Sequence, residues 1–227
     1  MSADSLIAAH GHLDGKALIA AIVEAFPGGV AVTASFGAES AVLLDLVAQV
    51  DPGLPVLFLD TGELFDETIA YRDLLVAQLG LTGLKVFRPA PEDLKEAEDL
   101  WRTDTDRCCE LRKVRPLAAA TRGFKALIDG RKRAHGFQRA DLAAIEAAGE
   151  VVKVSPLWSW SEADIAAAFA ARNLPPHPLV AQGFRSIGCW PCTRATASDE
   201  PARAGRWPGS AKTECGIHVP PPVRTGS

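Results

Sequence analysis

The sequence predicts one α/β domain built on a doubly wound parallel sheet and followed by an irregular, loop-rich C-terminal extension. Short apolar runs of β type alternate with stretches of helical periodicity over most of the chain. Beyond about residue 177, proline and glycine become frequent and the periodicity is lost. A length of 227 residues with 48% hydrophobic content fits a single domain with a sizeable core.

The strands and helices are expected to alternate in order along the chain. An amphipathic helix over 15–26 should end at the Pro27-Gly28-Gly29 stretch. Before the last helix, the spacing of Ser161 and Asp164 is typical of a capping box. The apolar runs predict strands at 30–34, 55–59, 84–87, 125–128 and 151–154, with further helices reaching to about residue 49, over 65–79, from about 91 to 101, and over 162–172.

Charge is unevenly distributed. The whole chain has a formal charge of −4. From Gly183 onward six basic residues face three acidic ones, so this part carries +3 and the remainder −7. A basic C-terminal part on an acidic body favours local binding of a small anion over a nucleic-acid surface.

The sequence favours a cytoplasmic protein that does not enter a membrane. It has no apolar run of 18 residues, and its first residues show no signal-peptide pattern. In such a protein, cysteines are more often metal-binding or catalytic than paired in disulfides.

The five cysteines form two close pairs and one single residue. Because the pairs Cys108-Cys109 and Cys189/Cys192 are far apart in sequence, they suggest one four-thiolate site that joins two segments. Zinc sites usually take thiols two to four residues apart, so the adjacent pair fits a cubane iron–sulfur cluster better than a zinc site. The fifth thiol, Cys215, is then free to act as a nucleophile.

Basic residues around the first pair, Arg107, Arg112, Lys113 and Arg115, could offset the negative charge of the thiolates. For Arg112 and Arg115 a solvated helix face is an equal alternative. His177 lies in a proline-rich segment and is expected to be structural.

Three loops that follow predicted strands could bind a nucleotide or another phosphate. Residues 35–40 connect a strand to a helix, a layout that points backbone N–H groups at an anion. Asp60 and Thr61 follow the second strand, and the basic stretch 129–139 follows the fourth. The alternatives are an ordinary β–α turn, a helix cap and a solubilising loop, respectively.

Taken together, these stretches resemble the PAPS/APS (sulfonucleotide) reductase family, in its assimilatory, adenylyl-sulfate (APS) branch. The resemblance spans about residues 31–218 and includes the cysteine set and the Glu214-Cys215-Gly216-Ile217-His218 ending. It implies an adenine-nucleotide α-hydrolase-like fold. Residues 1–198 would carry one [4Fe-4S] cluster, and residues 199–227 would form a mobile segment with the catalytic cysteine.

The resemblance also implies roles for individual residues. Cys215 would be the nucleophile and Lys113 would lie between cluster and substrate. Glu214 and His218 would either transfer protons or position the tail. Arg203 and Arg206 would close over the phosphosulfate. The cluster ligands would be Cys108, Cys109, Cys189 and Cys192, and the substrate-binding residues Ser35, Phe36, Gly37, Leu59, Thr61, Gly130 and Arg139.

The implied reaction reduces APS to sulfite and AMP through an S-sulfocysteine, with thioredoxin or a glutaredoxin-like protein as reductant, in sulfate assimilation and cysteine biosynthesis. A homo-oligomer is possible. Three alternatives remain open: reduction of PAPS or of both nucleotides, an ATP-dependent enzyme of the pyrophosphatase group, and a zinc-binding interaction module. The second expects a Ser-Gly-Gly-x-Asp-Ser loop, which residues 35–40 do not match.

Overall fold

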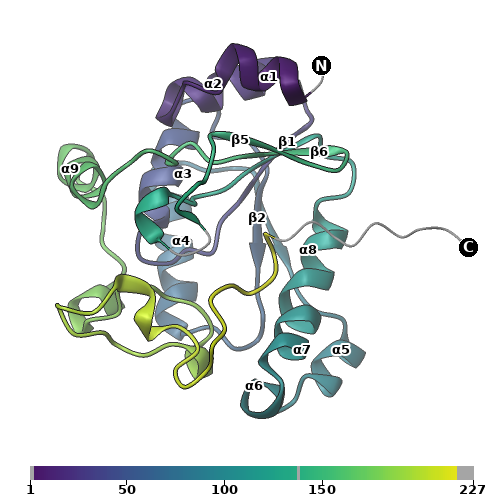
Figure 1. Ribbon diagram of the computed structural model, residues 1–227, viewed down its shortest axis with the longest axis vertical. Coiled ribbons are helices and arrows are strands. Elements are labelled where there is room, and N and C mark those ends of the chain that lie inside the picture. The colour runs from purple at the N-terminus through teal and green to yellow at the C-terminus, as the bar shows by residue number, and fades with distance from the viewer. Residues whose placement is uncertain (1–2, 137–138, 219–227) are drawn as a thin grey trace, which may run out of the picture.

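The computed structural model describes residues 3–136 and 139–218, and its fold is the predicted doubly wound α/β class (Figure 1). Six strands form one sheet in the order β3-β2-β1-β4-β6-β5. All neighbours pair in parallel except β5 and β6, which are antiparallel. The strands are β1 (Val30–Thr33), β2 (Val56–Leu59), β3 (Leu84–Phe87), β4 (Ala126–Ile128), β5 (Ile145–Ala148) and β6 (Val151–Val154).

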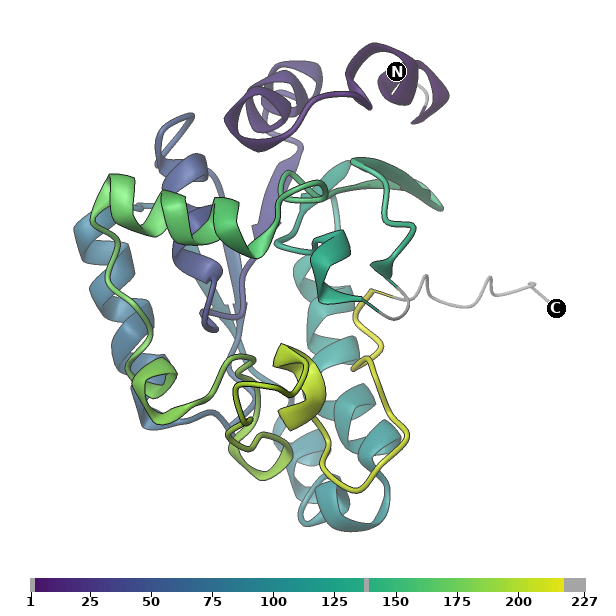
Figure 2. The ribbon, with the colours of Figure 1, turned by 60° about the vertical axis from the view of Figure 1, so that its left-hand side comes forward.

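Helices cover both faces of the sheet, with α3 (Ser40–Ala48) and α4 (Asp66–Leu79) on one side and α8 (Arg115–Ala120) on the other (Figures 1 and 2). The alternation of side chains along β1 explains this layering. Val30 and Val32 belong to the large core cluster that includes α3, whereas Ala31 packs with Leu57 and Ala120 on the α8 side. Helices α1 (Ala3–His10), α2 (Gly15–Ala25) and α9 (Glu162–Arg172) also contribute residues to the large core cluster.

The segment between β3 and β4 differs most from the prediction. The helix expected from about residue 91 to 101 is interrupted, because Asp99 adopts a left-handed conformation with φ 58°. Residues 110–114 form a π-helical turn, a widened turn that is frequent at functional sites. In order, this segment comprises α5 (Pro91–Glu96), α6 (Leu100–Thr103), α7 (Thr105–Cys109), the π-helical turn (Glu110–Val114) and α8.

Outside this segment, whose α7, π-helical turn and α8 were also not predicted, the unexpected elements are α1 and the edge strand β5. The other predicted strands and helices are present within one or two residues, and the capping box of Ser161 and Asp164 is formed.

The C-terminal part is irregular, as predicted, with short 3₁₀ turns at Pro178–Gln182, Trp190–Cys192 and Ala202–Gly205. Trp207 is buried within this part: it is 3% exposed, packs in a cluster with Cys189 and Cys192 against which Leu64 and Trp101 of the domain pack, and its backbone N–H donates to the Cys192 carbonyl at 3.0 Å. Residues 219–227 of the predicted segment 199–227 lie outside the described residues. No helix in the described part of the chain is long and apolar enough to cross a membrane.

His177 has a structural role, as the sequence suggested. Its ring is 1% exposed, its Nδ1 accepts from the Leu179 N–H at 3.2 Å, and its Nε2 lies 3.1 Å from the Thr68 hydroxyl. Since Nδ1 accepts, the neutral ring fits this environment. Burial lowers the pKa of His177 from 6.5 to about 4.

We predict that protonation of His177 contributes to acid destabilisation. The unfolded chain binds the proton first, so the stabilisation is complete above pH 6.5 and is lost as the pH falls toward about 4. The loss amounts to at most about 3 kcal/mol. Urea unfolding between pH 7 and 4 should show a shallower pH dependence for His177→Gln than for wild type. The exposed His12 provides the control, since His12→Gln should keep the wild-type dependence. An identical slope in His177→Gln would contradict the assignment.

Candidate active site

A cavity of about 350 Å³ lies at the carboxyl ends of the central strands. The chain leaves β1 toward β2 and β3 on one side, while β4 lies on the other side of β1. This reversal of strand order opens a crevice beyond the carboxyl ends of β1 and β4, the usual ligand position in such sheets. Ser35, Gly37, Leu59, Thr61 and Gly130 line it, as the sequence predicted.

The loop after β1 forms one wall of the cavity. Phe36 has a φ of 49°, and this turn places its ring in the core, edge-on to Phe58 at 5.3 Å between centroids. Phe36 is 0% exposed and is not among the cavity-lining residues, unlike its neighbours Ser35 and Gly37. A side chain at Gly37 would be tight, because its Cβ would lie 3.3 Å from the Ile187 carbonyl oxygen. Because its ring packs in the core, Phe36 supports the loop from beneath and does not face the cavity.

Glu39 and the loop after β4 form a buried ionic network. Lys132 is 1% exposed, and its Nζ lies 2.7 Å from Glu39 Oε1. His135 Nε2 lies 3.0 Å from Glu39 Oε2. Burial alone would raise the pKa of Glu39, but His135 and Lys132 outweigh it and lower that pKa.

Asp129, at the start of the same loop, also lines the cavity and binds several partners. Arg131 Nε donates to it at 2.8 Å and Ser155 Oγ at 3.1 Å. His218 Nδ1 lies 3.6 Å from Asp129 Oδ2, and the His218 carbonyl accepts from Lys153 Nζ at 2.6 Å. Burial lowers the pKa of His218 to about 4, so the ring is neutral near pH 7. His218 is thus held at the cavity wall by its backbone as well as its ring.

A second, smaller cavity is lined by all four paired cysteines, together with Trp101, Arg112 and Lys113. All four are buried, and none of them forms a disulfide. Helix α7 supplies Cys108 and Cys109, while Cys189 comes from the segment that pairs with Leu64 beside Thr61. The Thr61 hydroxyl lies 3.3 Å from Cys189 Sγ. Within the described residues, no three His, Cys, Asp or Glu side chains are placed to hold a single metal ion.

Lys113 lines both cavities. Burial would lower its pKa, but Cys189, Cys215 and Cys109 outweigh burial and raise it. In return, Lys113, the Thr61 hydroxyl and Arg206 overcome the effect of burial at Cys189 and lower the pKa of that thiol. Burial raises the pKa of Cys108 to about 11, and the pKa values of Cys109 and Cys192 are also raised by burial.

Three buried donors around these cavities have no hydrogen-bond partner among the described residues: Arg112 Nε, Arg206 Nε and Trp207 Nε1. Buried donors normally find acceptors. Arg112 lines the cysteine cavity, while Arg206 and Trp207 line the larger one. Each cavity is thus lined by at least one residue with a buried donor that has no partner within the described part of the chain.

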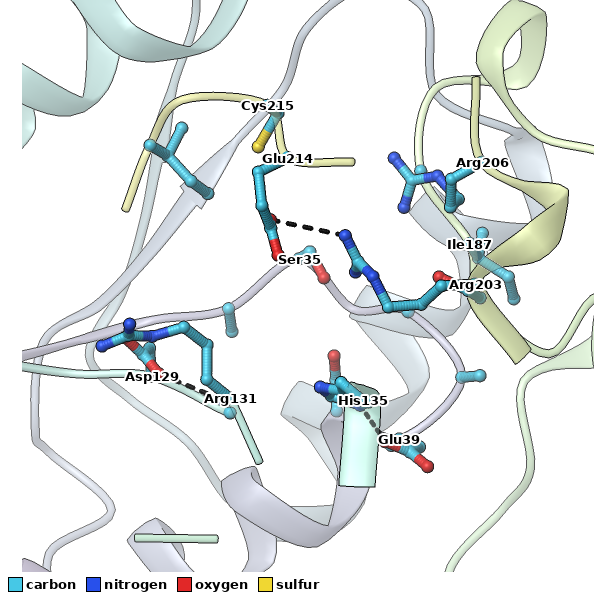
Figure 3. A pocket seen from close by; sticks show the side chains of 18 of the residues that line it. Ser35, Glu39, Asp129, Arg131, His135, Ile187, Arg203, Arg206, Glu214 and Cys215 are labelled. Atoms are coloured by element: carbon cyan, nitrogen blue, oxygen red, sulfur yellow. Dashed lines mark hydrogen bonds and ion pairs between the residues drawn. The ribbon is translucent and has the colours of Figure 1, made fainter. Parts of the chain in front are cut away.

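Cys215 is half-buried and lines the larger cavity from the C-terminal segment (Figure 3). Its neighbour Glu214 pairs with Arg139 at 2.7 Å and with Arg203 at 3.3 Å. Of the residues predicted as catalytic, the structure brings together Cys215, Lys113, Arg203, Arg206 and His218 around one cavity.

Sequence reasoning missed several residues that line the cavity. Glu39 lies within the predicted loop, and Asp129 directly follows a predicted strand, so both could have been found by position. Glu214 was expected, like His218, to transfer a proton or to position the tail, and its ion pairs with arginines were not predicted. Ile187 and Gly188 carry no chemical signal and line the cavity because the chain passes there before Cys189.

Fold and cavities together define an α/β protein of the doubly wound class with a cationic, thiol-bearing crevice at the switch point of its sheet. The chain belongs to the family of the phosphoadenosine phosphosulfate reductase domain, whose model matches residues 29–195.

Named relatives and solved structures are also similar to this chain. The adenosine 5′-phosphosulfate reductase of Chelativorans sp. (strain BNC1) is 49% identical over 220 residues, covering 95% of this chain and 90% of the relative. The crystal structure of phosphoadenylyl-sulfate reductase from Candida auris, a phosphate complex, has a TM-score of 0.71 and 27% identity, over 83% of this chain and 94% of that chain. The FMN adenylyltransferase of Candida glabrata, at a TM-score of 0.51 and 19% identity, covers 72% of this chain and 53% of that chain and shares the fold alone.

We predict that Gly188→Ala damages the cavity without unfolding the protein. A Cβ at Gly188 would overlap the Arg206 guanidinium, which stacks on Trp207 at 4.8 Å. Because that group ends a flexible side chain, it can swing away at a cost within about 1 kcal/mol in unfolding free energy. Binding of inorganic sulfate, measured by calorimetry, should weaken about fivefold. Gly29→Ala makes ordinary contacts and serves as the control. Unchanged sulfate affinity in Gly188→Ala would show that Arg206 does not serve the cavity.

Proposed function

We propose that the protein reduces adenosine 5′-phosphosulfate to sulfite and AMP through an S-sulfocysteine on Cys215. The observation that carries the proposal is the position of Cys215 in a cavity that also contains Lys113, Arg203 and Arg206. Three cationic side chains around one cavity suit APS, whose linked phosphate and sulfate groups each carry a negative charge. The reductase names of its relatives support the same reaction and its place in sulfate assimilation.

The chemistry follows from the position of the thiol. The Cys215 thiolate attacks the sulfate sulfur, forming an S–S bond, while the bond from sulfur to the bridging oxygen breaks and AMP leaves with the electron pair. A thiolate of the reductant then attacks Cys215 Sγ, and sulfite leaves with the electrons of the bond between the two sulfurs. A second thiol of the reductant resolves the mixed disulfide and regenerates Cys215. Two electrons thus pass from the dithiol to sulfur.

The surrounding cations have separate tasks in this scheme. Lys113 and Arg203 both interact electrostatically with Cys215 and would stabilise the negative charge that gathers around the reacting sulfurs. Arg206 offers an unused buried Nε to the incoming anion. Positive groups placed where negative charge gathers stabilise the transition state. His218 is held by Lys153 and Asp129, which favours a role in positioning the tail over proton transfer.

The four paired cysteines would hold one [4Fe-4S] cluster. Their fit rests on the donor set: four buried thiols around one cavity, beside the unpartnered Arg112 Nε and the cationic Lys113. Thiols that share a cavity without converging on one point suit a multi-iron cluster better than a single zinc ion. A bound cluster would join α7 to the 189–192 turn and supply negative charge beside Lys113.

Substrate, reductant and location are proposed as follows. The presence of all four proposed cluster cysteines favours APS as the substrate. PAPS is the second candidate substrate, because the family model and a solved relative are named for its reduction. The reductant would be thioredoxin or a glutaredoxin-like protein, and the unpaired thiols suit the cytoplasm. The segment from about residue 199 would be mobile, since Cys215 has to meet the substrate in a cavity and then a whole protein.

The reaction itself gives the direct test. Supplied with thioredoxin, the protein should release sulfite from APS faster than from PAPS. Without thioredoxin, mass spectrometry should find one added SO₃ on the Cys215 peptide. Cys215→Ser should bind APS and carry no adduct. An adduct on another cysteine would exclude Cys215 as the nucleophile, and faster release from PAPS would establish the second candidate.

Iron content tests the cluster separately. Replacing any one of Cys108, Cys109, Cys189 or Cys192 with serine should remove most of the iron and the visible absorbance of anaerobically purified protein, because each thiol supplies one ligand. Cys215→Ser is the matched control and should retain wild-type iron. Full iron in any of the four variants would remove that cysteine from the ligand set.

A further inference from the structure

Arg139 holds the Glu214 carboxylate by two parallel hydrogen bonds, the same geometry in which an arginine binds the carboxylate or phosphate of a ligand. Arg139 Nε donates to Glu214 Oε1 at 2.7 Å and Arg139 Nη2 donates to Oε2 at 2.9 Å, a two-pronged pair. Arg203 Nη2 lies 3.3 Å from the same Oε2. Figure 3 shows the Glu214 side chain extending from the tail toward Arg203.

Each of the two guanidinium groups also contacts a second group of the chain. Arg139 Nη1 lies 2.9 Å from His135 Nδ1, and Arg203 Nη2 donates to the Thr213 carbonyl at 2.7 Å. The side chains of Arg139, Arg203 and Glu214 are 11%, 13% and 16% exposed, so water screens the pairs weakly. Burial would raise the pKa of Glu214, but Arg139 and Arg203 outweigh it and lower that pKa, which keeps the carboxylate charged.

Other cations of the cavity are not used in this way. Across residues 3–136 and 139–218, neither Lys113 nor Arg206 has a carboxylate partner, and Arg206 Nε has no acceptor. Among these four cations, Lys113 and Arg206 are therefore without a carboxylate, whereas Arg139 and Arg203 already bind one.

We propose that Glu214 is an internal substitute for the substrate's anionic group: it occupies Arg139 and Arg203 in the ligand-free protein and gives them up when the phosphosulfate enters. This inference rests on the proposed function for the identity of the ligand. The exchange is one of ion pairs, with no bond made or broken. The phosphosulfate can displace Glu214 because it carries more charge and also meets Lys113 and Arg206.

The exchange would act on the nucleophile directly, since Glu214 and Cys215 are adjacent. On either side the tail has further attachments, Lys212 to Asp106 and the His218 carbonyl to Lys153. Between them Gly216 has a φ of 89°, a conformation that glycine adopts without strain. Release of Glu214 therefore lets the short stretch with Cys215 move while both ends of the tail stay attached.

Binding of APS to unreactive protein tests the proposal. In a Cys215→Ser background, we expect Glu214→Gln to bind APS about tenfold more tightly by calorimetry, because no internal anion has to be displaced. The matched control is Glu200→Gln. Glu200 receives a similar fork from Arg194, at 2.7 and 3.0 Å, but lies outside the cavity lining, so its loss should leave the APS affinity unchanged.

Equal or weaker APS binding by Glu214→Gln would overturn the proposal, and Glu214 would then only position the tail. If Glu214→Gln does not fold, Glu214→Asp carries the test: it keeps the charge but is too short to bridge both arginines, and should tighten binding to a smaller extent. Failure of the proposed function is distinguishable. A wild-type protein that binds APS but releases no sulfite would refute the reaction, while tighter binding by Glu214→Gln would still support the exchange.

Discussion

Lys113 lies where the cysteine cavity meets the larger crevice, and the rest of the site depends on the charge it places there. One ammonium group has thiols on one side and the space next to Cys215 on the other. Burial raises the pKa of the other paired cysteines, whereas Lys113, with the Thr61 hydroxyl and Arg206, outweighs burial at Cys189 and lowers its pKa. The π-helical turn that contains Lys113 directly follows Cys109, so cysteine pair and lysine are placed by one helical segment.

The tail is positioned by charge more than by apolar packing. Trp207 is its buried anchor, and from there to His218 the contacts described above are mostly ionic. Such contacts can be exchanged for those of an anionic ligand without exposing a hydrophobic core. A tail that binds in this way is suited to hold Cys215 against a small ligand and to present it afterwards to a protein partner.

The sequence predicted most of the fold because β1, β2 and β4 are apolar runs, which is typical of strands covered on both faces. It did not predict β5, since Ile145-Glu146-Ala147-Ala148 has no β preference of its own and pairing with β6 imposes the strand. The cysteine set could be predicted because residue type and spacing suffice. The Arg139–Glu214 pair could not, because 75 residues separate the partners and the contact depends on the path of the tail. Phe36 was expected at the ligand but lies in the core, since its positive φ turns the ring inward.

The most direct test of this account is a crystal structure of Cys215→Ser with APS bound. The account predicts that the phosphosulfate lies between Lys113 and Arg206, with the serine hydroxyl that replaces the Cys215 thiol about 3–3.5 Å from the sulfur and opposite the bridging oxygen. It also predicts that Arg139 and Arg203 bind the ligand and no longer Glu214. A nucleotide bound outside this crevice, or with its sulfate turned away from that hydroxyl, would contradict it.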